Sequence, residues 1–336
     1  MSNFHVTPSE LKELLRATIP ARLPVLITGA PGVGKSDIVT QAAAELGCDV
    51  ILSHPAVSDP TDLKGMPCII NGLADFQPFG ELRRAMEAST PTVWFLDDLG
   101  QAPQSVQAAA MQILLAREVA GHKVSDHVTF IAATNRREDR AGVSGILEPV
   151  KSRFATIVEL RVDVKAWETW ALANDIPTEL ISFIRFRPNL LCDFKPSMEL
   201  NNSPCPRTVH SVGKLMKAGI PKHLEYPAFA GAAGEGFSAE FLGFLKIFRN
   251  LPDPAAVLMN PDKADVPTDP ATLYALTGAL ARRANPENSE RFFQYSARLP
   301  AEFSVMMTRD AVALCPDIQK TRHYISWCVK NEDVLI

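Results

Sequence analysis

The sequence predicts an αβα sandwich built on a five-stranded parallel sheet, followed by an all-helical region. Three observations lead to this prediction. Five short β-type runs alternate with helical stretches in the first half of the chain, an order typical of a parallel sheet covered by helices. A glycine-rich loop joins the first run to a helix. After Leu160 the β-type pattern stops, and the remaining chain has helical patterns.

The first half begins with a helix predicted over residues 7–18. Its start is marked by Thr7, Pro8 and Glu10, a capping box with proline at the first helical position. Further helices are predicted over residues 36–46 and 103–118. The predicted strands are apolar or β-branched runs at residues 24–28, 49–53, 92–96, 128–134 and 155–160.

One segment interrupts the alternation of strands and helices. Residues 63–79 contain two apolar runs around Asn71-Gly72, a strong signal for a hairpin turn. We expect a hairpin inserted in the sandwich, and such elaborations often carry partner contacts. Phe76 and Phe79 are expected to pack in the hairpin's own core, the alternative being contact with a partner.

The second half is predicted to be helical. Helices are expected over residues 165–186, 207–218, 270–283 and 286–298. The starts of the last two are predicted from Asp269-Pro270 and Asn285-Pro286, in each of which a capping residue precedes proline. A proline-rich stretch over residues 251–270 reads as a linker. The predicted domains are therefore residues 1–161, 162–250 and 251–336.

Composition narrows the class of protein. The chain has 336 residues, 46% hydrophobic content and a net charge of −4, with no long basic run. This balance disfavours nucleic acid as the main ligand. We find neither a signal peptide nor 18 consecutive apolar residues, so the expectation is a cytoplasmic protein without a membrane span. The six cysteines form no CxxC pair and are expected to be reduced thiols.

The loop GAPGVGKS at residues 29–36 follows the first predicted strand and opens a helix, and it fits the pattern G-x-x-x-x-G-K-[ST]. Glycines let successive backbone N–H groups face phosphates, and the helix N-terminus adds positive charge. Lys35 is expected to reach the β- and γ-phosphates, and Ser36 to hold Mg²⁺. The alternative is a chance match to this pattern, which is disfavoured because the loop lies between a predicted strand and a predicted helix. The predicted nucleotide-binding residues are Gly29, Ala30, Pro31, Gly32, Val33, Gly34, Lys35, Ser36 and Asp37.

Two aspartates end the apolar strand at residues 92–96. Asp97 is expected to coordinate Mg²⁺ opposite Ser36. Asp98 stands where a base would polarise the water that attacks the γ-phosphate, the alternative being a helix N-terminal charge or an outer ligand. Asn135, after the strand at 128–134, is a candidate for sensing the γ-phosphate, the alternative being a turn cap.

In these motifs the chain resembles the AAA+ ATPases and, within them, the MoxR group. GAPGVGKS resembles Walker A, VWFLDD resembles Walker B, and FIAATN resembles the sensor-1 strand. The resemblance of SRF at 152–154 to the arginine-finger box implies that Arg153 reaches a neighbouring subunit's ATP. CPRTV at 205–209 is similar to the start of the sensor-2 helix, which implies that Arg207 contacts the γ-phosphate in the same subunit.

The resemblance also implies an architecture and partners. The segment at 63–79 is similar to the helix-2 insert of the MoxR clade, and residues 162–250 would be the α-helical lid, followed by a C-terminal helical extension. Such proteins form rings, typically hexamers of one chain, and couple hydrolysis of Mg-ATP to remodelling of a client protein. Many act with a von Willebrand A-domain partner.

One position departs from the family pattern. The family has Glu after the Walker B aspartate, whereas this chain has Asp98, which is one methylene shorter. Small misplacements of a catalytic group can cost about 10²-fold in rate. Either the backbone compensates, or another group such as Glu148 helps, or hydrolysis is slow.

Three functions remain open on the sequence. The first is a ring ATPase that remodels a protein partner. The second is an assembly scaffold gated by nucleotide with little hydrolysis. The third is a nucleic-acid motor, for which Lys64, Arg83 and Arg84 near the insert are the candidate contacts, although exposed arginine pairs are more often solvated surface.

Overall fold

The computed structural model describes residues 4–139, 145–196 and 200–332. They divide into two compact units. The first holds the chain up to Asp163 and a short segment beginning at Phe194, and the second holds Val164–Asp193 with the rest of the described chain. The second unit is not divided near residue 250, so a separate domain over residues 251–336 stays a prediction. Within the described ranges, no helix is long and apolar enough to cross a membrane.

The first unit contains a six-stranded sheet with the order β1-β10-β2-β9-β6-β3, and all its neighbouring strands are parallel. The predicted α/β fold class is confirmed, but the predicted count of five strands is one too few. The additional strand, β1, has only two residues and pairs with Glu159 and Leu160 at the sheet edge, and so short a strand has no periodic signal. The strands are β1 His5–Val6, β2 Val25–Thr28, β3 Asp49–Ser53, β6 Thr92–Leu96, β9 Val128–Thr134 and β10 Thr156–Leu160.

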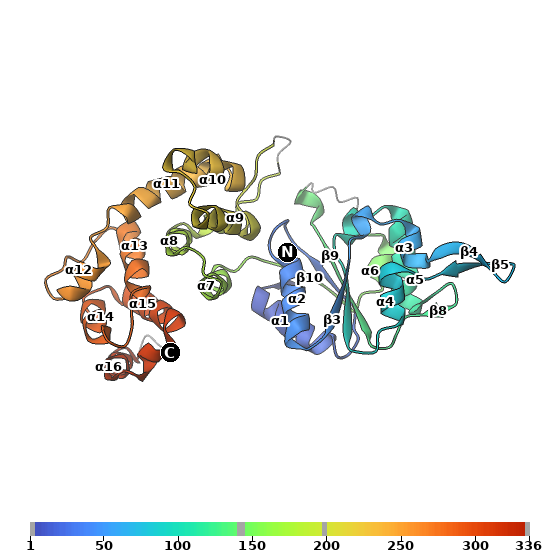
Figure 1. Ribbon diagram of the computed structural model, residues 1–336, viewed down its shortest axis with the longest axis horizontal. Coiled ribbons are helices and arrows are strands. Elements are labelled where there is room, and N and C mark those ends of the chain that lie inside the picture. The colour runs from blue at the N-terminus through green and yellow to red at the C-terminus, as the bar shows by residue number, and fades with distance from the viewer. Residues whose placement is uncertain (1–3, 140–144, 197–199, 333–336) are drawn as a thin grey trace. The chain divides into compact units, whose positions relative to one another are not determined.

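Helices cover both faces of this sheet (Figure 1). The alternation of side chains along each strand separates two cores: Val93 and Phe95 pack with α1 and α2, whereas Trp94 between them packs with α3 to α6. All three side chains are fully buried, which explains why this strand is apolar throughout. The helices are α1 Pro8–Thr18, α2 Lys35–Glu45, α3 Pro60–Lys64, α4 Gly80–Met86, α5 Gln104–Ala116 and α6 Glu148–Lys151.

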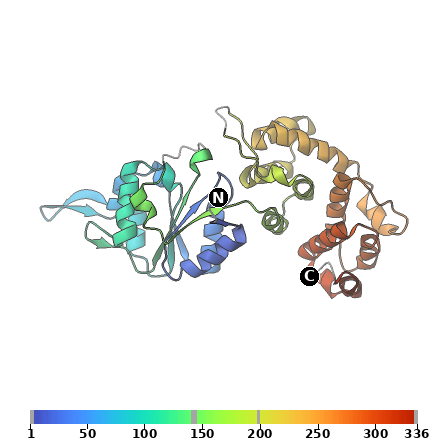
Figure 2. The same ribbon diagram turned by 180° about the vertical axis from the view of Figure 1, so that it is seen from behind.

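The predicted hairpin forms and projects from the body of the first unit (Figures 1 and 2). Its antiparallel strands are β4 Met66–Ile70 and β5 Leu73–Gln77. Asn71 and Gly72 have φ values of 53° and 81°, as a type I′ turn requires. The expectation that Phe76 packs in the hairpin's own core is wrong, since Phe76 is 40% exposed and two lone strands have no second layer to bury it.

A second, smaller hairpin lies beside the first and was not expected from the sequence. It pairs β7 Glu118–Val119 with β8 His122–Lys123. The predicted helix over residues 103–118 ends earlier, at Ala116, because Arg117 takes a positive φ of 51°. Nε2 of His122 lies 3.0 Å from the main-chain oxygen of Phe76, which joins the two hairpins.

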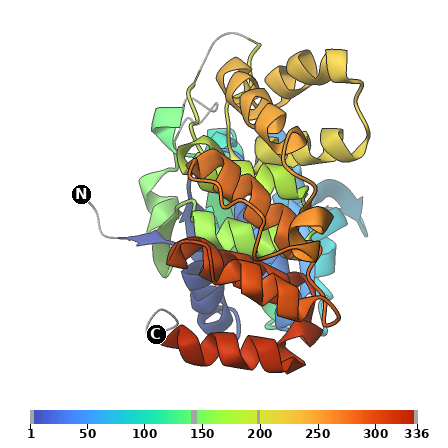
Figure 3. The same cartoon turned by 90° about the vertical axis from the view of Figure 1, so that its left-hand side faces the viewer.

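The regular elements described in the second unit are helices (Figure 3). The helix predicted over residues 165–186 is two helices, because Asp175 takes a φ of 53° just before Ile176 and Pro177. The helix predicted from residue 286 begins at Ser289 instead, after Asn285 and Asn288 bond to each other's backbone N–H. The helices are α7 Val164–Ala173, α8 Thr178–Phe186, α9 Pro206–Lys217, α10 Glu225–Ala233, α11 Glu235–Arg249, α12 Pro254–Met259, α13 Pro270–Ala281, α14 Ser289–Ser296, α15 Ala301–Leu314 and α16 Arg322–Lys330.

A buried ion pair joins helices of the second unit that are distant in the sequence. Arg185 of α8 binds both carboxylate oxygens of Asp310 on α15, and its Nε donates to Glu168 of α7 at 2.9 Å. The side chains of Arg185 and Asp310 are each 6% exposed. Burial by itself would lower the pKa of Arg185, but the two carboxylates outweigh this effect and raise it above its ordinary value. The contact ties the C-terminal helices to α7 and α8.

Replacing Asp310 with alanine is expected to destabilise the second unit by about 3 kcal/mol, because it leaves a buried guanidinium without its main partner. Urea unfolding followed by tryptophan fluorescence measures this loss, since Trp167, Trp170 and Trp327 lie in this unit. Asp317→Ala is the matched control, because its pair with Lys320 is exposed and its loss should change little. Equal effects of the two variants would contradict the prediction.

Candidate functional site

The glycine-rich loop connects β2 to α2 at the carboxyl edge of the sheet. Gly32 and Gly34 have φ values of 74° and 98°, which side chains with a Cβ atom rarely adopt. Gly34 is also the N-cap of α2 and, in the described part of the chain, gives the helix no side-chain cap. The first N–H groups of α2 are therefore available to an anion.

The start of the loop passes very close to β10. A Cβ atom on Gly29 would lie 2.9 Å from the main-chain oxygen of Leu160, so only glycine fits there. Ala30 and Val33 are buried and belong to the core shared with α1 and α2. Their side chains anchor the loop, which leaves its backbone as the part that can face a ligand.

Lys35 is the first residue of α2 and is only 6% exposed. Its Nζ donates to the main-chain oxygens of Gly29 at 2.9 Å and Ala30 at 3.0 Å, and to Oδ1 of Asn135 at 2.8 Å. The ammonium group is therefore held inside the loop it belongs to. A positive charge held beside the backbone of this loop is suited to attract the phosphates that the loop N–H groups would bind.

Ser36 and Asp97 meet although 61 positions separate them. Oγ of Ser36 donates to Oδ2 of Asp97 at 2.6 Å, and Oδ1 of Asp97 accepts the backbone N–H of Asp98 at 3.0 Å. A hydroxyl and a carboxylate side by side are oxygen ligands of the kind that Mg²⁺ prefers. The residues present therefore fit a magnesium site.

Asn135 lies between Lys35 and Asp98. Besides accepting from Lys35, its Nδ2 donates to Oδ1 of Asp98 at 3.3 Å. Asp98 adopts a left-handed backbone conformation with φ 57° and ψ 33°, which aspartate tolerates better than most residues. β2, β9 and β6 are neighbours in the sheet, and the residues that follow their carboxyl ends form this continuous set of contacts.

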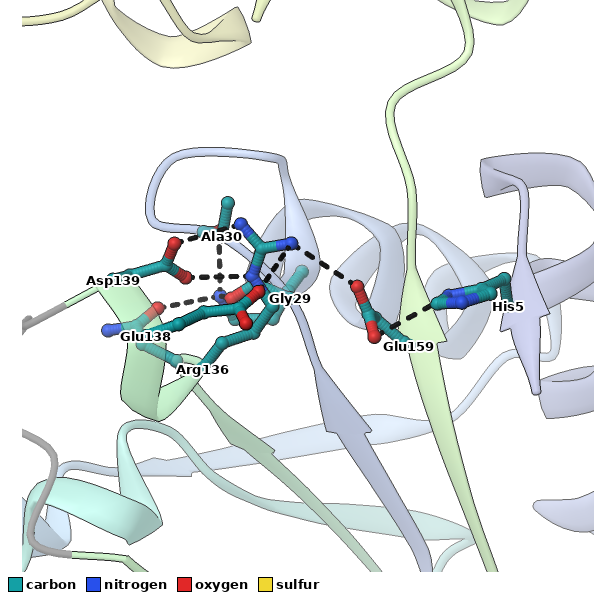
Figure 4. Close-up of polar contacts among 9 residues, drawn as sticks. His5, Gly29, Ala30, Arg136, Glu138, Asp139 and Glu159 are labelled. Carbon is teal, nitrogen blue, oxygen red and sulfur yellow. Dashed lines mark hydrogen bonds and ion pairs between the residues drawn. The ribbon is translucent and has the colours of Figure 1, made fainter. Parts of the chain in front are cut away.

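The residue after Asn135 is held by a polar network that sequence reasoning missed (Figure 4). Arg136 donates from Nε to Oδ2 of Asp139 at 2.9 Å and from a second nitrogen to Oδ1 at 2.8 Å, and it contacts Glu159 at 3.3 Å. His5 of β1 lies 3.5 Å from Glu159. Hydrogen bonding to Asp139 raises the pKa of Arg136 above its ordinary value. The run Arg-Arg-Glu-Asp at 136–139 was the available signal, and the network fixes the backbone beside Asn135.

Three further candidate residues lie in the first unit, and among its described residues they make no hydrogen bond or ion pair with this set. Arg153 follows α6 and is half-buried, and its Nε is buried without a hydrogen-bond partner among the described residues. Glu148 is 85% exposed and pairs with Lys151 at 2.5 Å, so its geometry does not support the idea that it assists Asp98. Asp37 is exposed in the first turn of α2. Arg207 is exposed in the first turn of α9 and belongs to the second unit.

Comparisons with known proteins match one part of the chain to a known family. Residues 24–154 match the family model of the AAA domain (dynein-related subfamily). No curated protein matches the chain significantly. Similar solved structures include the Thermotoga maritima RuvB Holliday junction branch migration motor, with 16% identity over 81% of this chain and 80% of that chain, at a TM-score of 0.41. Another is NtrX from Brucella abortus, with 15% identity over 91% of this chain and 67% of that chain, at a TM-score of 0.37.

Proposed function

We propose that this chain, whose residues 24–154 form an AAA domain, is a MoxR-like AAA+ ATPase that hydrolyses Mg-ATP and remodels a protein partner. It would act in the cytoplasm as a ring of identical subunits, with six as the expected number. A von Willebrand A-domain protein is the expected kind of partner. The observation that carries the proposal is the set of contacts in which Ser36 meets Asp97 while Asn135 joins Lys35 to Asp98.

Each residue of this set has a task in the proposed reaction. The backbone N–H groups after Gly32 and Gly34 bind phosphate oxygens, and Lys35 neutralises their charge. Ser36 and Asp97 would hold Mg²⁺, which supplies further positive charge to those oxygens. Asp98 accepts a proton from the attacking water, since Asn135 connects its carboxylate to the phosphate-binding Lys35. Asn135 hydrogen-bonds to that carboxylate and to the ammonium of Lys35, and it thereby fixes their positions relative to each other.

The two remaining arginines act from elsewhere. Arg153 would stabilise transition-state charge at the site of a neighbouring subunit. Its side chain is half-buried after α6, and among the described residues its Nε has no hydrogen-bond partner. Arg207 would contact the γ-phosphate in its own subunit from the helical lid.

The first hairpin is the proposed place of contact with a protein. Its exposed apolar side chains are Met66, Ile69, Leu73 and Phe76, with exposures from 40% to 79%. By the strand register, Ile69 and Phe76 share one face of the hairpin and Met66 and Leu73 share the other, so both faces expose apolar side chains. Exposed apolar surface of this kind is typical of a site that another protein covers.

A second candidate function is a scaffold that nucleotide holds together with little hydrolysis. The observation that favours it is the position of Asp98, whose short side chain starts from a left-handed backbone and is already bonded to Asn135. In this reading ATP promotes assembly, and the assembly persists without formation of ADP.

Replacing Asp98 with asparagine separates the two functions. If Asp98 is the base, Asp98→Asn lowers kcat by at least about 10²-fold while ATP binding is retained, because the amide cannot accept the proton. Asp98→Glu, which restores the side-chain length of the family, is expected to keep turnover. Steady-state release of phosphate, measured over a series of protein concentrations, gives both rates and also tests whether turnover requires assembly. A wild type that binds ATP but is no faster than Asp98→Asn would favour the scaffold.

A further inference from the structure

We infer that Gln107, a buried side chain of α5, is a positioning residue that fixes the segment carrying Arg153 and thereby the reaction at the neighbouring subunit's site. This role rests on the proposed function, because Arg153 has to act between subunits for it to matter. Gln107 lies in the first unit and touches none of the residues assigned to phosphates or Mg²⁺ in the contacts that the structure describes.

Gln107 is fully buried, and its side-chain amide bonds only to backbone. Nε2 donates to the main-chain oxygens of Ala102 at 3.1 Å and Gly145 at 3.0 Å, while Oε1 accepts the N–H of Leu147 at 3.0 Å. Both donors and one acceptor position of the amide are therefore in use. No apolar side chain of similar size can replace these three bonds, and its presence would take this partner from one buried and two half-buried backbone groups.

These bonds join two segments that belong to different parts of the proposed reaction. Ala102 comes four residues after Asp98, at the end of the short turn Leu99–Gln101. Leu147 is the N-cap of α6, and its main-chain oxygen accepts the N–H groups of Val150 at 2.8 Å and Lys151 at 3.1 Å. The first turn of α6 is therefore built on a residue that Gln107 holds.

Arg153 follows directly from that turn. Its backbone N–H donates to the main-chain oxygen of Val150 at 3.1 Å, and Val150 packs fully buried in the core shared with α5. Nε of Arg153 is buried but has no hydrogen-bond partner among the described residues, so this backbone and the surrounding packing, rather than a bond of Nε, place the side chain. Gln107 thus connects two segments of its own subunit: the one that follows Asp98, and the one that carries Arg153, which would contact the ATP of the neighbouring subunit.

The experiment uses Gln107→Met in the full chain, which keeps the volume of the side chain and removes its hydrogen bonds. We expect kcat to fall by about 10²-fold, the cost of misplacing a catalytic group by roughly an ångström. The dissociation constant for ATP should stay within about threefold, because the phosphate-binding loop is untouched. Thr129→Val is the matched control, since it removes a buried bond to the main-chain oxygen of Ile19 at the opposite end of β9.

Mixing of subunits distinguishes positioning of Arg153 from a general loss of stability. Gln107→Met has an intact site but a misplaced arginine, whereas Lys35→Ala has an inactive site and a normal arginine. In a ring formed from equal amounts of the two, roughly a quarter of the interfaces combine an intact site with a normal arginine. Turnover in the mixture should therefore rise well above that of either variant alone. An arginine misplaced only by unfolding of the subunit would give no such recovery.

Arg153→Ala mixed with Lys35→Ala shows which proposal fails. If this pair recovers turnover and the Gln107→Met pair does not, the role of Gln107 is overturned while the intersubunit reaction stands. If neither pair recovers, Arg153 does not act between subunits, and the role of Gln107 falls with it. Wild-type turnover by Gln107→Met alone would also overturn the inference.

Discussion

Replacing Arg153 with alanine is expected to lower kcat by about 10³-fold or more while ATP still binds. An arginine supplied to another subunit's nucleotide acts on charge that develops in the transition state, and such groups are worth 10³ to 10⁵ in rate, or about 4–7 kcal/mol. Arg153 follows α6 with a half-buried side chain, so part of that side chain remains accessible at the surface of the first unit. The measurement is steady-state phosphate release at saturating ATP, with nucleotide affinity determined separately by calorimetry.

Lys151→Ala is the matched control for Arg153→Ala. It removes a positive charge two residues away, but Lys151 already pairs with Glu148 on the surface of α6. We expect wild-type turnover from this variant. Turnover by Arg153→Ala at the wild-type rate, or a rate that does not rise with protein concentration in the wild type, would contradict the intersubunit role.

Replacing Lys35 with alanine is expected to lower kcat/KM by about 10³-fold, through both binding and rate. The residue is a preorganised positive charge in a buried site, and loss of one such group typically costs 10² to 10³ in rate alone. Its removal also takes a hydrogen bond from Asn135, the side chain that contacts Asp98. Calorimetric titration with ATP and steady-state kinetics measure the two contributions.

Two further variants make the result for Lys35 specific. Lys12→Ala removes an exposed lysine that pairs with Glu45, and it should leave both constants unchanged. The effects of Lys35→Ala and Asn135→Ala should not add, because the two side chains share one contact. Strict additivity would show that Asn135 does not work through Lys35, whereas unchanged ATP binding by Lys35→Ala would place the nucleotide elsewhere.

The sequence by itself determined the elements whose causes are local. The five predicted runs form β2, β3, β6, β9 and β10. β6 and β9 are buried at every residue, as a continuous run of apolar and β-branched residues predicts. The turn at Asn71-Gly72 follows from two residues that tolerate positive φ. Ser36 and Asp97 could be paired in advance, since a loop motif and a strand-end acid on parallel strands meet at the carboxyl edge of the sheet.

Only the tertiary structure decided the features that depend on distant residues. The two-residue strand β1 forms because it pairs with the edge of β10. Glu159 of β10 also contacts Arg136, 23 positions away in the sequence. Nothing in the predicted helix over residues 103–118 singles out Gln107, yet the fold bonds its buried side chain to Gly145 and Leu147, 38 and 40 positions away. Periodicity reports which face of an element is apolar over a few residues. It carries no information about which backbone groups, dozens of positions away, will need a hydrogen-bond partner once that face is buried.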